Sequence, residues 1–176
     1  MRTAAVKSDA KQDKAGTCNH HCSVVTIGGF GVLIEGSSGS GKTSLALGLL
    51  DACKVRGIDG ALVADDQALL ACSEGSLKAF APGAIRGMAE IRGYGIVSLP
   101  FEESATIHLI ARLVDDETVE RMPEEKYLSS IDTLTLQEPV LVHDLPKRHE
   151  AQCIRIVMAV LENRFGLRQK LTQQLR

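Results

Sequence analysis

Eight consecutive residues have the types and spacing needed to bind phosphate: Gly36, Ser37, Ser38, Gly39, Ser40, Gly41, Lys42 and Thr43. They match the phosphate-loop pattern G-x-x-x-x-G-K-[ST] at every fixed position. In such a loop the glycines allow successive backbone N–H groups to point into one concavity that holds phosphate oxygens. The lysine can bridge the outer phosphates, and the final hydroxyl can ligate magnesium. Residues 36–43 therefore predict the binding of a nucleotide through its phosphates.

The sequence on either side of the loop predicts the elements that must position it. Residues 32–35 form a short apolar, β-branched run, which is typical of a buried strand. Residues 44–50 are rich in helix formers, and we expect this helix to extend to about residue 54 or 55, with Gly57 and Gly60 as stop signals. A strand, a glycine-rich loop and a helix in this order are the context that the motif requires.

An acidic pair, Asp65 and Asp66, follows the apolar run at residues 61–64. Ligands of open α/β sheets gather at the carboxyl ends of the strands, so we expect this pair to face the same crevice as the phosphate loop. Adjacent carboxylates suit magnesium binding and proton transfer. In isolation, such a pair is more often a helix N-cap or a solvated turn. The phosphate loop upstream favours the functional interpretation.

The remaining patterns predict an α/β fold with a mixed β-sheet core that contains the phosphate loop and is flanked by helices. The expected elements are a hairpin of residues 23–27 and the strand before the loop, a second hairpin of residues 68–72 and 77–80, strands at 107–114 and 140–143, and a helix at 150–164. Glu90 and Arg92 would share one face if they lay in a strand. The sequence predicts no helix or strand in the polar stretch between Pro123 and Pro139.

The composition is that of one ordinary globular domain. The 176 residues are 44% apolar and 24% charged, with a formal charge of −2. This charge argues against nucleic-acid binding through bulk electrostatics. No stretch approaches the roughly 18 apolar residues of a membrane span, and the N-terminus lacks the apolar core of a signal peptide. We therefore expect a cytoplasmic protein without membrane contact.

Residues 1–17 are expected to form a disordered tail, residues 18–166 the folded domain, and residues 167–176 a C-terminal tail. The five cysteines are an odd number, which does not suggest a secreted disulfide framework. Residues 18–22 place cysteines and histidines close enough to ligate a soft metal. No second Cys/His pair at a finger-like distance completes four ligands, so a metal site there is disfavoured.

Several motifs in this order resemble the catalytic domain of HPr kinase/phosphorylase. They are a histidine before a strand, Gly-Phe-Gly-Val-Leu-Ile, the phosphate loop, Leu-Val-Ala-Asp-Asp and Ala-Glu-Ile-Arg-Gly-Tyr-Gly-Ile-Val. The Glu-Ile-Arg-Gly-x-Gly-Ile stretch is much more specific than the phosphate loop. The resemblance covers about residues 19–165 and corresponds to the short form, which lacks the N-terminal domain of many relatives.

This resemblance implies a kinase that transfers the γ-phosphate of ATP, with Mg2+, to a serine of the phosphocarrier protein HPr. It also implies a fold related to phosphoenolpyruvate carboxykinase, and a homo-oligomer that is usually a hexamer. By motif, His21 matches the active-site histidine and Lys42 the catalytic lysine. Asp65 and Asp66 match the pair that contains the proton acceptor, and either acid is open for that role. The residues that match the magnesium site are Thr43, Asp66 and Glu90.

The resemblance also implies roles for arginines. Arg92 belongs to the specific signature, and Arg121 matches a later active-site arginine. Arg148 matches the second arginine of an Arg-Pro-Gly-Arg-Asn segment associated with dephosphorylation, which this chain keeps only in part. After Val97 the chain is shortened and loses a glycine-rich active-site loop. Kinase activity is therefore a safer inference than phosphorylase activity.

Two other functions are compatible with the same loop. A small-molecule kinase would need a substrate pocket of its own, and the chain lacks an obvious lid. A nucleotide-sensing regulatory module would keep the phosphate cradle without turnover. Phosphate transfer to a protein substrate distinguishes the HPr kinase from both alternatives, whereas nucleotide binding distinguishes none of them.

Overall fold

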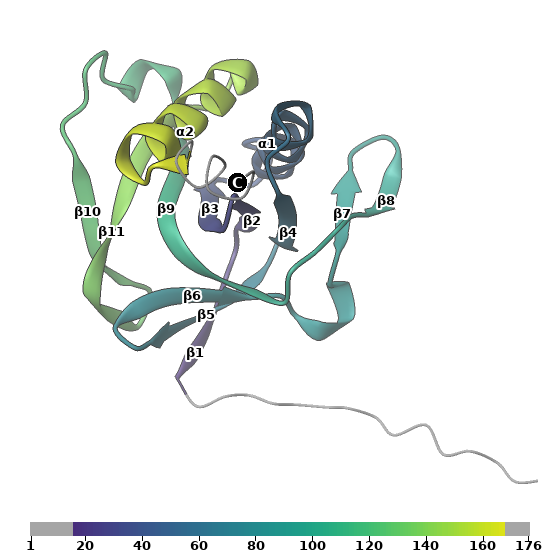
Figure 1. The fold of residues 1–176 in the computed structure, drawn as a ribbon, viewed down its shortest axis with the longest axis horizontal. Helices are drawn as coiled ribbons and strands as arrows, with labels where there is room; N and C mark the ends of the chain where they lie inside the picture. The colour runs from purple at the N-terminus through teal and green to yellow at the C-terminus, as the bar shows by residue number, and fades with distance from the viewer. Residues whose placement is uncertain (1–15, 168–176) are drawn as a thin grey trace, which may run out of the picture.

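The computed structural model describes residues 16–167, which form a curled β-sheet with helices packed on one face (Figure 1). The tails expected at residues 1–17 and 167–176 lie almost entirely outside the described residues. In chain order the elements are β1 (Thr17–His20), β2 (Ser23–Ile27), β3 (Phe30–Gly36), α1 (Lys42–Arg56), β4 (Gly60–Ala64), β5 (Ala68–Ser73), β6 (Ser76–Phe80), η1 (Gly83–Ile85), β7 (Met88–Ile91), β8 (Gly95–Ser98), β9 (Ser104–Val114), η2 (Asp116–Thr118), β10 (Lys126–Ile131), β11 (Leu134–Pro146) and α2 (Glu150–Arg164).

The main sheet is mixed, as the sequence predicts. Its order is β1-β5-β6-β9-β3-β2-β4, and β11 pairs with both β9 and β10. β9 runs parallel to its neighbours β3 and β11, whereas the other pairings are antiparallel. Gly36 pairs with Leu113, and Pro146 pairs with Val114. The carboxyl ends of β3, β9 and β11 therefore lie along one edge, from which the loop between β3 and α1 projects.

β3 is buried on both of its faces. Its Val32 and Ile34 belong to the core beneath α1 and α2, whereas Leu33 belongs to a second core on the opposite side. Adjacent side chains of a strand point to opposite faces, so a continuous apolar run is needed here. The curl of the sheet closes over the second core, where β5 and β11 contribute Leu70 and Val140 (Figure 1). This burial fixes the strand that leads into the loop.

α1 begins and ends at glycines. Gly41 caps its N-terminus with a φ of 97°, a left-handed conformation that L side chains rarely adopt. Gly57 follows its last residue with a φ of 65°, and its N–H bonds back to the final turn. Leu45, Leu49 and Cys53 recur at helical spacing and are buried against the sheet. The helix predicted after the loop is confirmed and extends to Arg56.

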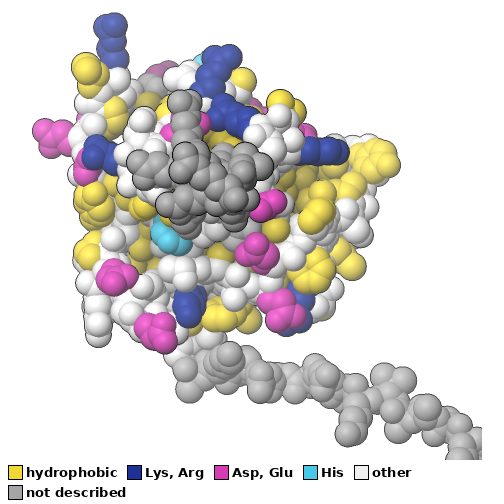
Figure 2. All heavy atoms as spheres, in the orientation of Figure 1, with side chains coloured by type: hydrophobic (Ala, Val, Ile, Leu, Met, Phe, Trp, Pro, Cys, Tyr) yellow, Lys and Arg dark blue, Asp and Glu magenta, His cyan; other side chains and the backbone are white. Residues whose placement is uncertain are grey.

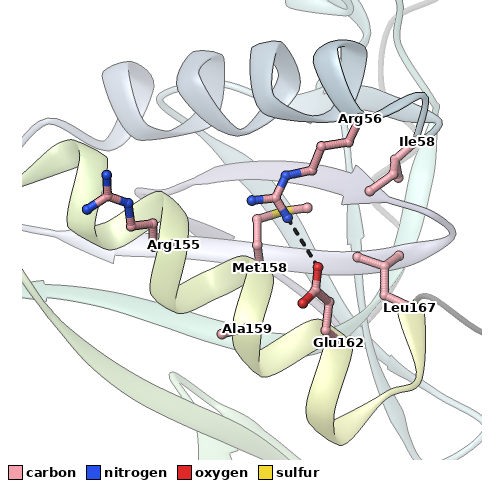
Figure 3. A pocket seen from close by; sticks show the side chains of 7 residues that line it. All are labelled: Arg56, Ile58, Arg155, Met158, Ala159, Glu162 and Leu167. Atoms are coloured by element: carbon pink, nitrogen blue, oxygen red, sulfur yellow. Dashed lines mark hydrogen bonds and ion pairs between the residues drawn. The ribbon is translucent and has the colours of Figure 1, made fainter.

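α2 packs closely beside α1 at Gly48. A Cβ at this position would lie 2.7 Å from Ile154 Cδ1, so the tip of the Ile154 side chain would have to move to admit one. Near the C-terminal end of α1, Arg56 Nη1 pairs with Glu162 Oε1 at 3.2 Å beside a cavity of about 420 Å³ (Figure 3). The phosphate loop lies at the other end of α1. Among residues 16–167, no helix has the length and apolar character of a membrane span.

The structure corrects the sequence interpretation at two strands. β1 and β10 were not predicted, and each pairs with a single neighbour. Because such strands bury few side chains, their sequences lack an apolar run. β11 also begins at Leu134 rather than near residue 140. Pro139 is tolerated because it falls where the register between β10 and β11 shifts.

The stretch around residue 92 also differs from the expectation. Glu90 lies in β7, but this strand ends at Ile91, and residues 92–94 form the turn to β8. The N–H of Tyr94 donates to the Ile91 carbonyl at 2.9 Å, which closes the turn. Arg92 therefore does not share a strand face with Glu90.

We expect Leu49→Ala to lower the free energy of unfolding by about 3 kcal/mol, because truncating a fully buried leucine leaves a cavity. Val55→Ala on the same helix is the matched control. Val55 is 87% exposed, so its truncation should change the free energy by about 0.5 kcal/mol or less. Urea unfolding followed by far-UV circular dichroism measures both variants. Equal losses would contradict the buried face assigned to α1.

Candidate active site

Residues 36–43 form a tight loop between β3 and α1. Gly36 leaves no room for a side chain, since a Cβ there would lie 2.6 Å from Ser40 Oγ. The Ser40 N–H donates to the Ser37 carbonyl at 3.1 Å, which closes the loop on itself. The N-terminus of α1 follows at once, and its unsatisfied N–H groups favour an anion. The loop therefore has the donors that a row of phosphates requires.

Lys42 is buried at the base of this loop, with 7% of its surface exposed. Its Nζ donates to the carbonyl oxygens of Gly36 at 3.0 Å and Ser37 at 3.2 Å. The third contact of Nζ is His21 Nε2 at 2.9 Å. The ammonium thus bridges the loop and the segment between β1 and β2.

The contacts of His21 determine its tautomer. Its Nδ1 lies 2.8 Å from the Asp66 carbonyl oxygen, which can only accept a hydrogen bond. Its Nε2 faces Lys42 Nζ, which can only donate. We therefore assign the neutral Nδ1–H form, since it alone satisfies both contacts. The Asp66 carboxylate lies 3.2 Å from the same Nδ1, on a residue with a φ of 66°.

Asp65 has a different environment from its neighbour. It is 5% exposed and lies at the end of β4. Its Oδ1 accepts from Ser23 Oγ at 2.7 Å and from Thr43 Oγ1 at 2.8 Å. Its Oδ2 accepts from the Glu90 N–H at 3.3 Å. One buried carboxylate therefore ties β2, α1 and β7 together beneath the loop.

A cavity of about 480 Å³ collects most of the predicted site residues. Those that line it are His21, Ser38, Gly39, Gly41, Lys42, Thr43, Asp65, Asp66, Glu90 and Arg92. They come from four regions of the sequence: the β1–β2 junction, the loop with α1, the end of β4 and the β7–β8 hairpin. The acidic pair and the phosphate loop therefore face one crevice, as expected.

The structure does not bring Arg121 and Arg148 into this cavity. Arg121 lines a separate cavity of about 520 Å³, which Asp116, His143 and His149 also line. The backbone N–H of Arg148 donates to Asp116 Oδ1 at 3.2 Å. This second cavity follows the ends of β9 and β11, so it lies along the same edge of the sheet as the loop.

Sequence reasoning missed Ser23 and Glu35. Ser23 is fully buried and donates to Asp65, but a serine within a strand gives no signal of such a role. Glu35 ends an apolar run directly before Gly36, and its carboxylate binds Arg112 and His20. A charged residue inside a buried strand was the available signal for a buried ion pair.

The donor set fits a nucleotide with magnesium. The loop N–H groups and Lys42 suit phosphate, and Thr43 Oγ1 lies beside the carboxylate of Asp65. Within residues 16–167, no three His, Cys, Asp or Glu side chains are arranged to hold a metal by themselves. One or two carboxylates together with phosphate oxygens and water are the ligands that Mg2+ usually takes.

Comparison with known proteins identifies the family. The profile of the HPr Serine kinase C-terminal domain matches residues 12–141, which is most of the chain. The chain belongs to this family. The chain is 32% identical over 163 residues to the HPr kinase/phosphorylase of Clostridium novyi, covering 86% of this chain and 50% of that protein. It is 30% identical over 138 residues to that of Leptothrix cholodnii, covering 72% and 41%.

The chain thus spans half or less of the length of these curated relatives. The chain is also similar to the structure of the Hpr(Ser) kinase/phosphatase from Coxiella burnetii, with a TM-score of 0.62 and 25% identity. That match covers 83% of this chain and 99% of the other. The resemblance predicted from the motifs is confirmed at the level of the family and of its mixed α/β fold.

We expect NMR spectra of the histidine ring nitrogens to show His21 mainly as the Nδ1–H tautomer near neutral pH, because Lys42 donates to Nε2. Lys42→Met removes the ammonium from Nε2 and should change the Nε2 chemical shift of His21, while the Nδ1–H persists because the Asp66 carbonyl still accepts from it. Lys54→Met is the matched control, since Lys54 is an exposed lysine of the same helix. Identical His21 signals in Lys42→Met and the wild type would contradict the contact.

Proposed function

We propose that this HPr kinase domain is an ATP-dependent serine kinase that phosphorylates HPr. The observation that carries the proposal is a chain of contacts across one cavity. Lys42 Nζ contacts His21 Nε2 at 2.9 Å, and His21 Nδ1 contacts the Asp66 carbonyl at 2.8 Å. These contacts connect Lys42, the cation that would bind phosphate, with Asp66, the acid that would accept a proton. The curated relatives named above carry the name HPr kinase/phosphorylase.

The chain's own residues account for binding and orientation of ATP. The phosphates would lie in the concavity of residues 36–43, where loop N–H groups and the start of α1 donate hydrogen bonds. Lys42 would exchange contacts with loop carbonyls for contacts with the outer phosphates. Bound Mg2+ would neutralise charge on the transferred group. Thr43 and Asp65 are the residues that would hold it, because they already lie 2.8 Å apart.

The two acids suit different tasks. Asp65 accepts three hydrogen bonds and is buried, so it is suited to orienting Thr43 and the metal. The Asp66 side chain is 74% exposed at the cavity, where a serine hydroxyl could reach it. We therefore assign proton acceptance to Asp66, with His21 orienting it, and give Asp65 the metal role that the motif resemblance implied for Asp66. Glu90 remains a candidate ligand on the opposite wall.

An apolar rim beside the cavity favours a protein substrate over a small molecule. The β7–β8 hairpin exposes hydrophobic side chains, which gather on one side of the molecule (Figure 2). Tyr94 is 80% exposed and Ile96 is 71% exposed, while Ile91 and Arg92 of the same hairpin line the cavity. Exposed apolar groups next to a site commonly mark a protein contact. A protein that presents a serine to this cavity would cover the hairpin.

Other family properties complete the proposal. We infer that the domain comprises residues 18–166 and that its phosphate-loop fold is related to phosphoenolpyruvate carboxykinase. We also infer a cytoplasmic homo-oligomer, with a hexamer as the expected state, and no nucleic-acid or membrane partner. Arg92 at the cavity is a candidate contact for phosphate or HPr. The cavity that Arg121 lines is separate from this one. Arg121 and Arg148 could therefore act only if substrate or another subunit extends the site.

Transfer of label from [γ-32P]ATP with Mg2+ to purified HPr tests the kinase. We expect the wild type to label HPr, and an HPr whose acceptor serine is replaced by alanine to stay unlabelled. Lys42→Ala should lower the rate by about 100-fold or more, because it removes a charge that stabilises the transferred group. The exposed Lys54→Ala variant should keep wild-type activity. ATP binding without any transfer would contradict the kinase and favour the sensing module.

A second pair of variants separates the acids. Asp66→Asn should lower kcat by about 100-fold or more while nucleotide binding persists, since it removes the proton acceptor. Asp65→Asn should instead weaken Mg2+-dependent ATP binding, because it disturbs Thr43. Calorimetric titration with a non-hydrolysable ATP analogue, with and without Mg2+, measures the binding. If Asp66→Asn loses the Mg2+ dependence and Asp65→Asn keeps it, our assignment of the two acids is reversed.

A further inference from the structure

His20, the last residue of β1, is held between two carboxylates. Its Nδ1 lies 2.8 Å from Asp132 Oδ2, and its Nε2 lies 3.5 Å from Glu35 Oε2. A carboxylate faces each ring nitrogen, and since ionised carboxylates only accept hydrogen bonds, a proton on both nitrogens satisfies both contacts. The hydrogen bond to Glu35 raises the pKa of His20, burial opposes this rise, and Asp132 adds to it. The geometry therefore describes an imidazolium, next in sequence to the neutral His21.

Glu35 connects this cluster to the phosphate loop. It directly precedes Gly36, whose carbonyl oxygen accepts from Lys42 Nζ at 3.0 Å. Burial would raise the pKa of Glu35, but hydrogen bonds from His20 and Arg112 outweigh it, so the pKa is lowered. Arg112 Nη1 lies 4.0 Å from Asp144 Oδ1 and extends the cluster across the sheet. Glu35 is thus an ionised anchor at the start of the loop.

The backbone gives His21 little support of its own. The last paired residues of β2 and β3 on this side are Ser23 and Ile34, so residue 21 lies beyond their ladder. β1 ends at His20, which pairs with Ala68 of β5. The position of His21 therefore depends on its contacts with Asp66 and Lys42 and on how firmly His20 is held. Both His20 and His21 line another cavity of about 560 Å³, together with Glu35 and Gly36.

We propose that His20, bound as an imidazolium between Glu35 and Asp132, is a positioning residue for His21 and for the start of the phosphate loop. The charged groups that face this cluster are Glu35 from β3, Asp132 from the β10–β11 turn and, through Glu35, Arg112 from β9. Cys18 of β1 also contacts Asp132, with Sγ 3.6 Å from Oδ2. The effect of His20 on catalysis rests on the proposed kinase function, whereas the effect of His20 on the position of His21 does not.

The sign of the pH dependence follows from the raised pKa. Below this pKa the imidazolium keeps both carboxylate contacts, and they are lost as the pH rises through it. A neutral ring has only one N–H, so one carboxylate then faces a nitrogen lone pair. The cluster is therefore most firmly held below the raised pKa of His20 and loosens as the pH rises through it.

The kinase assay across a pH series tests the role in catalysis. We expect wild-type kcat to fall as His20 loses its proton. His20→Gln cannot carry charge and should lower kcat at neutral pH by about 10-fold to 100-fold, through misplacement of His21. His20→Lys keeps a cation up to about pH 10, so it should restore most of the activity and lack the alkaline fall. Asp132→Asn should move the fall to lower pH.

Glu103→Gln is the control for Asp132→Asn, because it removes the carboxylate of an exposed ion pair with Arg86 at 3.1 Å. It should leave the pH profile unchanged. Equal losses in His20→Gln and His20→Lys, with a wild-type pH profile in both, would indicate a merely structural role and overturn the proposal.

NMR spectra of the histidine ring nitrogens of the full chain test the positioning without any activity. We expect the tautomer ratio and chemical shifts of His21 to change as His20 titrates, and His20→Gln to show the altered ratio at every pH. Constant His21 signals through the titration of His20 would overturn the proposal even if HPr is phosphorylated. A His21 response in a chain that does not phosphorylate HPr would support the positioning role while the proposed function fails.

Discussion

The buried ammonium of Lys42 is the charge on which the arrangement of the site depends. Its partners in the described part of the chain are the carbonyls of Gly36 and Ser37 and the imidazole of His21. Burying a cation is costly unless it is paired, and dipoles compensate it less than an anion does. The loop must therefore keep its carbonyls aimed at Nζ, and the neutral tautomer of His21 must be maintained. The same incomplete compensation leaves Lys42 ready to bind the phosphates of a nucleotide.

Asp65 and Asp66 show how one turn gives adjacent acids different environments. Asp65 still follows the direction of β4, which carries its side chain under the loop to Ser23 and Thr43. The φ of 66° at Asp66 reverses the chain, so its carbonyl meets His21 while its carboxylate stays exposed. Paired carboxylates whose surroundings differ in this way can divide metal orientation and proton transfer between them. The division of these two tasks between Asp65 and Asp66 depends on backbone conformation more than on residue type.

The sequence predicted the parts of the molecule whose signals are local. The strand, loop and α1 follow from apolar runs and from the glycines at residues 36, 41 and 57, and α2 follows from its helical face. β1 and β10 were missed because edge strands bury too little to leave a pattern. Arg121 and Arg148 were grouped with the loop by motif order, but Arg121 lines a neighbouring cavity and the backbone of Arg148 contacts Asp116, another residue of that cavity. Such placement depends on tertiary contacts that spacing does not encode.

The two adjacent histidines, His20 and His21, also differ in a way that sequence spacing does not encode. In the sequence the two histidines stand side by side, and the motif resemblance singled out only His21. In the structure their partners differ in what they can donate or accept: two carboxylates for His20, and a carbonyl with an ammonium for His21. A charged His20 beside a neutral His21 satisfies all of these contacts. The dipeptide thus links the ionic cluster around Glu35 to the cavity that His21 shares with Lys42.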